Sequence, residues 1–406
     1  MRRSLDFFDL QILEGLGIYG PRNITAVARK LGVPEATLRR RLRQMLSQVF
    51  LHANVYHTYI GLRKVIVLAK AFQGYENLLY ECMDAHDYLI YISRCFGAYE
   101  GCVAIYAIPT EHFDDFEQFL KHLESKKVAA SIQHHWSTCF QTVNLKCDWY
   151  NRDAEKWDFF WKEWVQEVLS EGTELPFTLE DPPGYPLKAD KTDIFILKEL
   201  EKDATTSLKD IATQLNTSVP LIKYHYDQHV IGRQLLEDYQ VIYYPFEKSK
   251  SNGFFFIFTF ANLKNMAKFA RSLLDKPFAF SLGKIYGNPA LFAYLYLPIK
   301  EFRRFVQSLG ELIRLGLLHK YEYVLQDLET TRQFTITYKS FKNKSWLYEQ
   351  EKYLKKANDL IDTEKLQFVE RKIQIAPSIN NLTFATADET RDKEKEITSP
   401  SSSSSI

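Results

Sequence analysis

The sequence has 406 residues, 46% hydrophobic and 25% charged, and this length and balance predict a folded, globular chain of roughly two to four domains. The formal net charge of +1 at pH 7 excludes a general attraction to nucleic acid or to an anionic membrane, so any basic surface must be local. Five cysteines without CxxC spacing indicate reduced thiols, and no apolar run approaches the roughly 18 to 20 residues of a membrane span, so we expect a cytoplasmic protein that enters no membrane.

Three short helical patterns open the chain. The first covers 6–16, with its apolar residues on one face. Asn23 is expected to cap a second helix over 24–31, and Pro34 to begin a third that runs to Leu46. The step at Gly32-Val33 supplies the turn between them. Two helices joined by a tight turn predict a helix-turn-helix.

A strand-helix-strand-strand-helix-strand pattern follows, which is the order of a ferredoxin-like domain. Its expected elements are a strand at 64–71, a helix at 75–85, strands at 88–95 and 101–108, a helix at 111–126 and a strand at 129–136. Beyond it, 153–169 carries tryptophans and other apolar residues at helical spacing and predicts an amphipathic helix docked on a neighbouring domain. The proline-rich stretch 172–186 predicts a loop that separates two halves.

The second half repeats the order of the first. The segment Asp9–Leu13 recurs as Asp193–Leu197, an offset of about 184 residues that also aligns the apolar positions of the next two helices. Ser207 and Ser218 are expected to cap the second and third helices, the third ending at Gln228. The expected ferredoxin-like elements are strands at 253–260, 279–286, 290–297 and 318–326, with helices at 263–274 and 299–315.

The sequence therefore predicts an α+β chain in which two winged or plain helix-turn-helix units are each followed by a ferredoxin-like βαββαβ sandwich. After the second sandwich we expect a charged helical segment and then a polar, disordered tail that ends in serines. The expected domains are helix-turn-helix 1 at 1–54, ferredoxin-like domain 1 at 55–150, the amphipathic helix and linker at 151–189, a degenerate helix-turn-helix 2 at 190–245, ferredoxin-like domain 2 at 246–340, the helical segment at 341–375 and the tail at 376–406.

The D-x-x-I-L opening, the A-x-x-L-G turn and the T-L-R-R-R-L helix at Thr37 to Leu42 together resemble the Lrp/AsnC family of transcriptional regulators. The segment from Gly97 through Tyr99 and Glu100 to Gly101, followed by a strand and Pro109, is similar to that family's G-x-Y-D loop. The resemblance implies an amino-acid effector at Gly97, Tyr99, Glu100 and Gly101. Because relatives dimerise through the ferredoxin-like domain, it also implies that the two halves form an internal pseudo-dimer, and further self-association is left open. We then expect the two sheets to pack against each other and to bury aromatic strand residues such as Phe256, Phe258 and Tyr294.

Double-stranded DNA is the expected partner, because the predicted third helix has an apolar face for its own unit and a basic face for the major groove. Arg40 and Arg43 are the best candidates for base contacts, since an arginine fork fits guanine O6 and N7. Arg41 lies beside the apolar face, where we expect its stem to pack and its head to reach solvent. The full expected DNA-contacting set is Thr37, Arg39, Arg40, Arg43 and Gln44 on the helix, with Arg2, Arg3, Arg29 and Lys30 at phosphates.

The third helix of the second half lacks these arginines. Asp227 takes the place of Arg43, and a carboxylate repels phosphates, so we expect weak DNA binding or an architectural role there. His225 and His229 share a helical face, but no cysteine or carboxylate nearby in the sequence completes a zinc motif. His134-His135 alternates across a strand and cannot chelate one ion. We therefore expect no metal and no cofactor.

No catalytic constellation emerges from the sequence, so the chain is expected not to be an enzyme. One enzyme family remains as an alternative, because siroheme decarboxylases resemble the same two-domain arrangement and carry a Y-N motif in the α/β domain. Here Tyr150-Asn151 comes after the predicted sheet, which argues against that activity. A protein-interaction scaffold with vestigial helix-turn-helix units is the other alternative. The preferred hypothesis is a sequence-specific DNA-binding regulator.

Overall fold

The structure is a computed structural model that describes residues 5–379, with side-chain surroundings as far as residue 366. The chain divides into a compact body, residues Met1–Ala357, and a second part, Asn358–Ile406. The features described below belong to the body unless the text says otherwise. No helix among the described residues is long and apolar enough to cross a membrane.

The first helix-turn-helix unit consists of α1 (Phe7–Tyr19), α2 (Ile24–Leu31) and α3 (Glu35–Met45). Asp6 caps α1 in a reciprocal capping box with Asp9, and the Asn23 side chain accepts a hydrogen bond from the backbone of Ala26 at the start of α2, as its sequence predicts. Gly32 ends α2 with a φ of +65°, a left-handed conformation that favours glycine. The tight turn before α3 follows from this residue.

The second unit consists of α7 (Lys191–Lys202), α8 (Leu208–Gln214), α9 (Val219–Tyr224) and the π-helical segment η4 (His225–Ile231). Ser207 and Ser218 cap α8 and α9 as predicted. The expectation of one regular third helix to Gln228 is wrong, because the backbone changes to π-helical geometry at His225. Within this irregular segment both His225 and His229 turn toward the start of α7.

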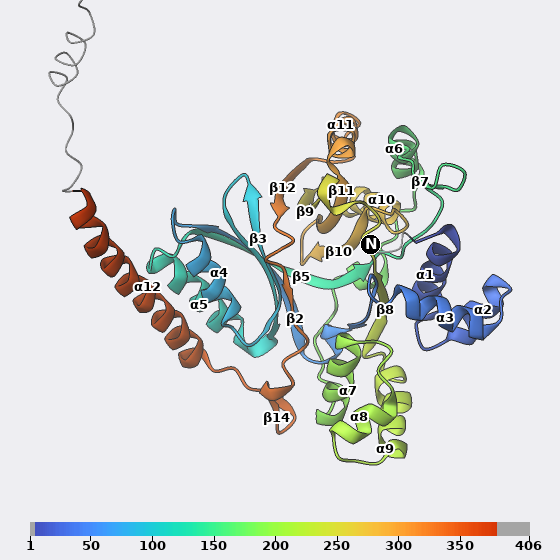
Figure 1. Ribbon diagram of the computed structural model, residues 1–406, viewed down its shortest axis with the longest axis horizontal. Coiled ribbons are helices and arrows are strands. Elements are labelled where there is room, and N and C mark those ends of the chain that lie inside the picture. The colour runs from blue at the N-terminus through green and yellow to red at the C-terminus, as the bar shows by residue number, and fades with distance from the viewer. Residues whose placement is uncertain (1–4, 380–406) are drawn as a thin grey trace, which may run out of the picture. The chain divides into compact units, whose positions relative to one another are not determined.

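A two-stranded antiparallel ribbon joins the units. It is formed by β1 (Phe50–Val55), which follows α3, and β8 (Leu236–Ile242), which follows η4. In its register Asn54 pairs with Asp238, two positions that lie 184 residues apart. The first helix of each unit packs on the strand of the other, α1 on β8 and α7 on β1 (Figure 1). The two units are therefore crossed over a shared ribbon.

Each half then contributes four antiparallel strands and two helices, and in both halves the strand order along the sheet is fourth, first, third, second. The first half contains β2 (Leu62–Ala71), α4 (Glu76–Asp84), β3 (Leu89–Gly97), β4 (Gly101–Pro109), α5 (Phe113–Ser125) and β5 (Ala129–Thr142). The second contains β9 (Ser251–Thr259), α10 (Leu263–Leu273), β10 (Ala279–Ile285), β11 (Ala290–Pro298), α11 (Ile299–Arg314) and β12 (Lys320–Gln326).

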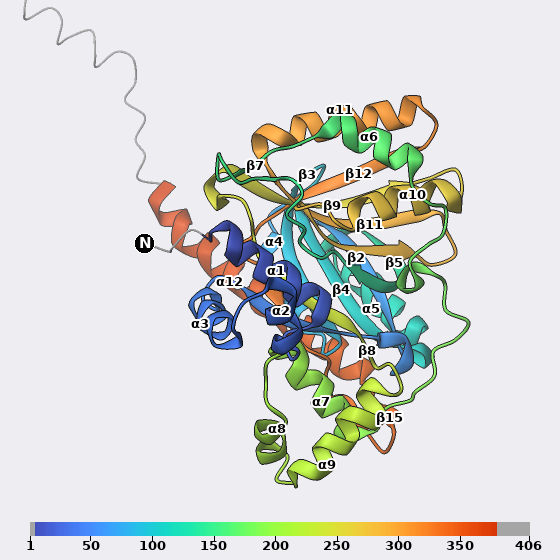
Figure 2. The same cartoon turned by 90° about the vertical axis from the view of Figure 1, so that its right-hand side faces the viewer.

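The two sheets close on each other through two seams. The fourth strand of each half pairs with the second strand of the other, β5 with β10 and β12 with β3, so the eight strands form a closed ring (Figure 2). The short strand β13 (Arg332–Gln333) pairs with β3 along the same edge as β12, at the part of β3 that β12 leaves unpaired. The helices lie outside the ring, and apolar side chains such as Ile66, Phe255 and Phe292 fill its inside.

The two sheets pack within the chain, as expected, but through other side chains than the sequence suggests. Phe256 and Phe258 were expected at the contact between sheets, and this is wrong for both. They point outward into the core beneath α10 and α11, because neighbouring positions on a strand face opposite sides. Tyr294 does face the interior, together with Phe255 and Phe292.

The linker differs from its expected form. The hairpin β6 (Tyr150–Asn151) and β7 (Lys156–Trp157) occupies the start of the region predicted as a helix, and α6 covers only Trp161–Ser170. As expected, α6 docks on a neighbouring domain: it packs on α10 and α11, and the Trp161 indole donates a hydrogen bond to buried Glu301 at 2.9 Å. The helical spacing of apolar residues thus predicts α6 correctly. The aromatic residue Trp157, before α6, belongs to the hairpin instead.

The region 341–375 is not wholly helical as predicted. It begins with a hairpin of β14 (Phe341–Lys342) and β15 (Ser345–Trp346), and α12 (Gln350–Ile379) follows. The predicted disordered tail starts at 376, but 376–379 is helical and 380–406 lies outside the described residues. Short helical turns complete the chain: η1 (His57–Tyr59), η2 (Thr110–His112), η3 (Phe177–Leu179), η5 (Lys248–Lys250) and η6 (Tyr338–Ser340).

Candidate functional site

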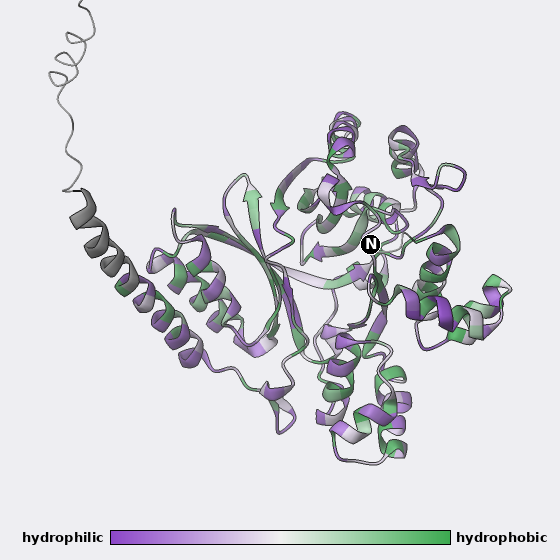
Figure 3. Cartoon of the chain, in the orientation of Figure 1, coloured by the Kyte–Doolittle hydropathy of each residue, from purple (hydrophilic) through white to green (hydrophobic). Residues whose placement is uncertain are grey.

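The outward face of α3 carries the charged residues that the sequence singles out. Its inward residues Leu38, Leu42 and Met45 are buried in the unit, which fixes the rotation of the helix. The opposite face is hydrophilic over much of its length (Figure 3). Four of the predicted contact residues are exposed on it and Thr37 is half-buried; the exposed four are Arg39, Arg40, Arg43 and Gln44.

These arginines differ in how they are held. The Arg39 guanidinium pairs with Glu35 one turn earlier, at 2.5 Å, and the Arg43 Nε donates to the Arg39 carbonyl at 3.3 Å. Arg40 forms no hydrogen bond or ion pair with any residue that the structure describes. An arginine without a protein partner keeps all of its donors for a ligand. Arg40 and Arg43 therefore remain the best candidates for contact with a base or phosphate.

Arg41 is only partly exposed, and its guanidinium is held by two aspartates of its own unit, partners that the sequence did not indicate. Its Nη1 lies 2.7 Å from Asp6 and 3.1 Å from Asp9. The Asp9 side chain is only 1% exposed, and the hydrogen bond to Asp6 raises the pKa of Arg41 above its ordinary value. Arg41 thus neutralises the carboxylate pair that caps α1, which explains why only part of the arginine run faces outward.

Two further predicted phosphate contacts are exposed at the end of α2, Arg29 and Lys30. Their position in the last turn also suits the negative end of the helix dipole. Arg2 and Arg3 lie outside the described residues. The described basic surface of the first unit is therefore formed by α3 and the end of α2.

The corresponding face of the second unit is less basic. The Lys223 ammonium pairs with Asp227 at 3.0 Å, and both groups are largely exposed. Tyr224 is 54% exposed beside them. Because the lysine charge is neutralised by its neighbour, this face offers a phosphate much less attraction than α3 does.

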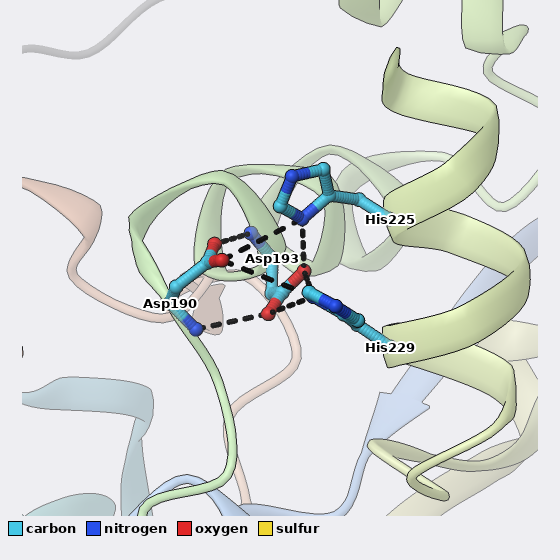
Figure 4. Close-up of side chains that lie close together, drawn as sticks. All are labelled: Asp190, Asp193, His225 and His229. Carbon is cyan, nitrogen blue, oxygen red and sulfur yellow. Dashed lines mark hydrogen bonds and ion pairs between the residues drawn. The ribbon is translucent and has the colours of Figure 1, made fainter. Parts of the chain in front are cut away.

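The structure brings two carboxylates from a distant part of the sequence to His225 and His229, where no nearby part of the sequence completes a metal motif. Asp190 caps α7 and Asp193 sits in its first turn. The Nδ1 atoms of His225 and His229 lie 2.8 Å and 3.1 Å from Asp193 Oδ1, and 3.6 Å and 3.8 Å from Asp190 Oδ2. Figure 4 shows the four side chains converging from α7 and η4. Sequence reasoning missed the pair because it lies about 32 residues upstream.

A cavity of about 710 Å³ lies between the inside of the strand ring and the β1–β8 ribbon. Its ring side is aromatic, and its ribbon side carries polar groups from β1, from the end of α7 and from β8. The main polar or aromatic side chains that line it are His52, His57, Lys64, Tyr91, Glu201, Gln240, Tyr244, Phe255, Phe292 and Tyr294.

Lys64 is the charged centre of this cavity. It is 8% exposed and lies 4.6 Å from the centre of the Phe140 ring, but it forms no hydrogen bond or ion pair with any described residue. Burial raises the pKa of Glu201 to about 8, and its Oε2 accepts from the backbone of Ile336 at 2.7 Å. Lys64 therefore forms no ion pair with a described carboxylate, although its charge acts on the nearby carboxyl groups of Glu201, Glu237 and Asp238.

Two histidines beside Lys64 are held neutral. Burial lowers the pKa of His52 to about 4 and that of His57 well below its ordinary value. The Nδ1 of His57 lies 2.8 Å from the Val55 carbonyl and donates to it, and its Nε2 has no partner among the described residues. The cavity wall thus offers one cation, Lys64, beside two neutral imidazoles.

The loop from Gly97 to Gly101, which was expected to bind an effector, needs its two glycines for the backbone conformation and for close packing. Gly97 has a φ of +117°, and a Cβ on Gly101 would lie 1.9 Å from the Ala69 carbonyl of the adjacent strand. Tyr99 is half-buried against the inside of the ring, and Glu100 is exposed. None of these four residues lines the cavity, so the effector site at this loop stays a prediction.

Other flagged residues have ordinary surroundings. His134 pairs with Glu117 at 3.2 Å, and burial lowers the pKa of neighbouring His135. Tyr150 and Asn151 form β6, outside the strand ring. All five cysteines are free thiols.

Comparison with known proteins gives one family match and several similar structures. Residues 190–228 match the family of winged helix-turn-helix DNA-binding domains, so the matched segment is the second unit rather than the arginine-rich first. No curated protein sequence matches the chain. AsnC family transcriptional regulators resemble about a third of it: one from Agrobacterium tumefaciens is 15% identical with a TM-score of 0.27, covering 32% of this chain and 89% of that one, and AsnC of E. coli is 16% identical with a TM-score of 0.25, covering 33% and 92%.

Two similar structures span most of the chain. They are crystal structures of the siroheme decarboxylase NirDL, alone and with an iron-uroporphyrin III analogue, both 11% identical, with TM-scores of 0.46 and 0.47, covering 88% of this chain and 99% of that one. The expectation that the chain is not an enzyme is contradicted by this finding, because these full-length neighbours are structures of an enzyme. That expectation depended on the lack of a catalytic constellation in the sequence and on the position of Tyr150-Asn151 after the predicted sheet.

Proposed function

We propose that the chain is a DNA-binding transcriptional regulator of the Lrp/AsnC type that reads the major groove with α3. The observation that carries this proposal is the outward face of α3, where Arg40 has no partner among the described residues and Arg43 is exposed beside it. The match of residues 190–228 to winged helix-turn-helix DNA-binding domains supports the same class of partner. In this proposal Arg29 and Lys30 contact phosphates and position the helix.

The two halves act as an internal pseudo-dimer in this proposal, each built from a helix-turn-helix and a ferredoxin-like sandwich. The ribbon supports the idea, because Asn54 and Asp238, which are 184 positions apart, face each other and are joined by a 2.7 Å hydrogen bond. Arg22 likewise donates to the Thr206 carbonyl across the same separation, at 2.7 Å. A two-fold axis between equivalent halves predicts such self-pairing. One chain then carries two helix-turn-helix units that bind DNA with unequal strength.

A salt titration of DNA binding tests the proposal. Full-length protein is titrated against random duplex and against a duplex selected for binding, at several salt concentrations, and Arg40→Ala plus Arg43→Ala is compared with wild type. If both arginines meet base edges, the double variant loses roughly 2 to 6 kcal/mol on the selected site, the sum of two contacts of about 1 to 3 kcal/mol each.

A matched control removes two positive charges elsewhere. Lys300→Ala plus Arg303→Ala changes the net charge equally on exposed positions of α11. This control should bind DNA as wild type does. Equal affinity of the α3 variant and wild type for the selected site would refute DNA reading by α3, and equal losses in the two variants would reduce the effect to net charge.

A second candidate function is small-molecule binding in the cavity, and buried Lys64 is the observation that favours it. A buried cation without a paired carboxylate favours an anionic ligand, and the aromatic wall favours an apolar body. Because the cavity also contacts the β1–β8 ribbon and the end of α7, an occupant touches the elements that position the helix-turn-helix units. The cavity is in this reading an effector site.

The anionic aromatic dye anilinonaphthalene sulfonate is a suitable probe, since its fluorescence rises in apolar surroundings. Wild type should enhance the fluorescence saturably, and Lys64→Met should weaken dye binding about tenfold or more. Lys70→Met is the control, because Lys70 lies on the same strand and is exposed. Equal binding by all three proteins would exclude Lys64 as the anion contact.

A further inference from the structure

The Asp190, Asp193, His225 and His229 cluster, here called the Asp-His cluster, occupies the same place in its unit as an ion-pair cluster in the first unit. Asp6 and Asp9 lie 184 positions before Asp190 and Asp193, and both aspartate pairs form the capping box of the first helix. In the first unit the cation is Arg41. The second unit has His225 at that position and His229 where the first has Met45.

The exchange changes the charge balance around a buried carboxylate. Arginine keeps its positive charge throughout the pH range in which proteins fold, whereas a histidine can be neutral near pH 7. Asp193 is 0% exposed, and an ionised carboxylate so far from water needs a cation close by. The exchange therefore replaces a permanent cation by two imidazole nitrogens, which unlike a guanidinium can coordinate a metal ion.

The ligand atoms suit a metal ion. They are two imidazole nitrogens and two carboxylate oxygens, a set that zinc and related transition metals accept. One such atom from each residue lies within 4.8 Å of all the others. In a tetrahedral site with bonds of about 2.1 Å the ligand atoms are about 3.4 Å apart, and the four nitrogen-oxygen separations of 2.8 to 3.8 Å bracket that value.

We propose that Asp190, Asp193, His225 and His229 bind one divalent transition-metal ion of the zinc class. Both histidines coordinate through Nδ1, the atom that faces the carboxylates in Figure 4. Four protein ligands fill a tetrahedral shell, so the ion is structural and leaves no open position for a substrate. It fastens the π-helical segment η4 to the first turn of α7, and so reinforces the direct packing of these two elements.

The first unit supplies a variant that should fold without metal. His225→Arg together with His229→Met copies Arg41 and Met45 and restores a permanent cation beside the aspartates. This double variant is expected to keep its stability in the presence of a chelator. It separates loss of metal binding from loss of folding, which alanine variants of a buried cluster would confuse.

The experiment is calorimetric titration of zinc chloride into full-length protein first dialysed against a chelator. Wild type should take up one ion per chain, and the melting temperature should rise when zinc is added. The double variant should lose at least about a hundredfold in affinity, more than the 10 to 100-fold cost of losing residues that merely orient ligands. His134→Gln, which lies in β5 and outside the cluster, should bind zinc as wild type does.

Cobalt chloride gives an independent reading of geometry, since tetrahedral cobalt absorbs visible light far more strongly than octahedral cobalt. Wild type should develop the strong absorption, and the double variant should not. No uptake by wild type would overturn the proposal. Equal uptake by wild type and the double variant would overturn it too, because the ion would then sit elsewhere.

Discussion

In the first helix-turn-helix unit one arginine of the third helix points inward and three point outward, whereas in the second unit the third helix turns two histidines inward and neutralises its outward lysine. Both units have the same capped first helix with two aspartates. The same arrangement of helices therefore divides its charges between interior and surface in different ways. The first unit leaves exposed cations on its third helix, whereas the charged side chains of the second are paired within the unit.

The largest contrast lies at the ends of the first helices, where the second unit has Glu201 and the first has Gly17. Burial raises the folded-state pKa of Glu201 to about 8, from an ordinary value of 4.5. The folded state therefore favours the protonated carboxyl. Stability from this group is fully present below pH 4.5 and is lost as pH rises through about 8. Glu201→Gln should be more stable than wild type at pH 9 by on the order of 4 kcal/mol.

Denaturant unfolding of wild type and Glu201→Gln at pH 5, 7 and 9 measures this effect. The difference between the two proteins should grow with pH. Glu180→Gln serves as the control at an exposed position and should follow wild type. Parallel curves for Glu201→Gln and wild type would mean that Glu201 is not held protonated.

The next contrast is between inward and outward arginines of α3. Arg41→Ala removes the guanidinium beside Asp9, which is 1% exposed, and should cost about 2 to 3 kcal/mol of stability, between the values for exposed and buried pairs because Arg41 is itself 24% exposed. Arg39→Ala breaks an exposed pair with Glu35 and should leave stability nearly unchanged. Urea denaturation of both variants decides the matter. Similar losses in the two would remove the distinction between structural and ligand-facing arginines.

A charge reversal on α3 should weaken DNA binding by a smaller free energy. Arg43→Asp places in the first unit the residue that the second unit has at Asp227. The expected loss is about 1 to 3 kcal/mol, and the salt dependence should become shallower by about one counterion. Fluorescence anisotropy with labelled duplex at increasing salt measures both. An unchanged slope would show that Arg43 does not meet a phosphate or a base.

The smallest effect is expected from the reverse change in the second unit. Asp227→Arg adds a cation and also releases Lys223 from its 3.0 Å ion pair, so it should steepen the salt dependence by one to two counterions, roughly 0.9 per phosphate contact. Asp227→Asn releases Lys223 alone and should give about half of that change. If both variants behave as wild type, the third helix of the second unit does not face DNA.

The sequence predicts local elements well and long-range partners poorly. The capping residues Asn23, Ser207 and Ser218 were identified from side-chain chemistry that acts within three residues. The strands of both sheets lie close to their expected bounds, because alternating and continuous apolar runs are local patterns. The partner strands β5 with β10 and β3 with β12 could not be derived, since pairing between distant strands leaves no periodic signal.

The candidate sites show the same limit. Arg40 and Arg43 could be chosen because one helix carries both the apolar and the basic face. Arg41 was misjudged because its aspartate partners lie 32 and 35 residues away. Lys64 lies on an apolar strand and gave no signal, although a lysine in such a run is itself unusual. The proposed role of Lys64 in ligand binding depends on a cavity that forms only when the two halves pack together.

Closure of the strand ring has to wait until the last strand has been synthesised. The edge strand β3 is translated early, but its partner arrives late, since Cys95 pairs with Gln326 roughly 230 residues further on. At about 5 to 20 residues per second the nascent chain exposes this edge for roughly 10 to 50 s. An exposed strand edge is a template for pairing with another chain. Two chains made side by side on one messenger could therefore exchange β12, forming a strand-swapped dimer with the same hydrogen bonds as the monomer.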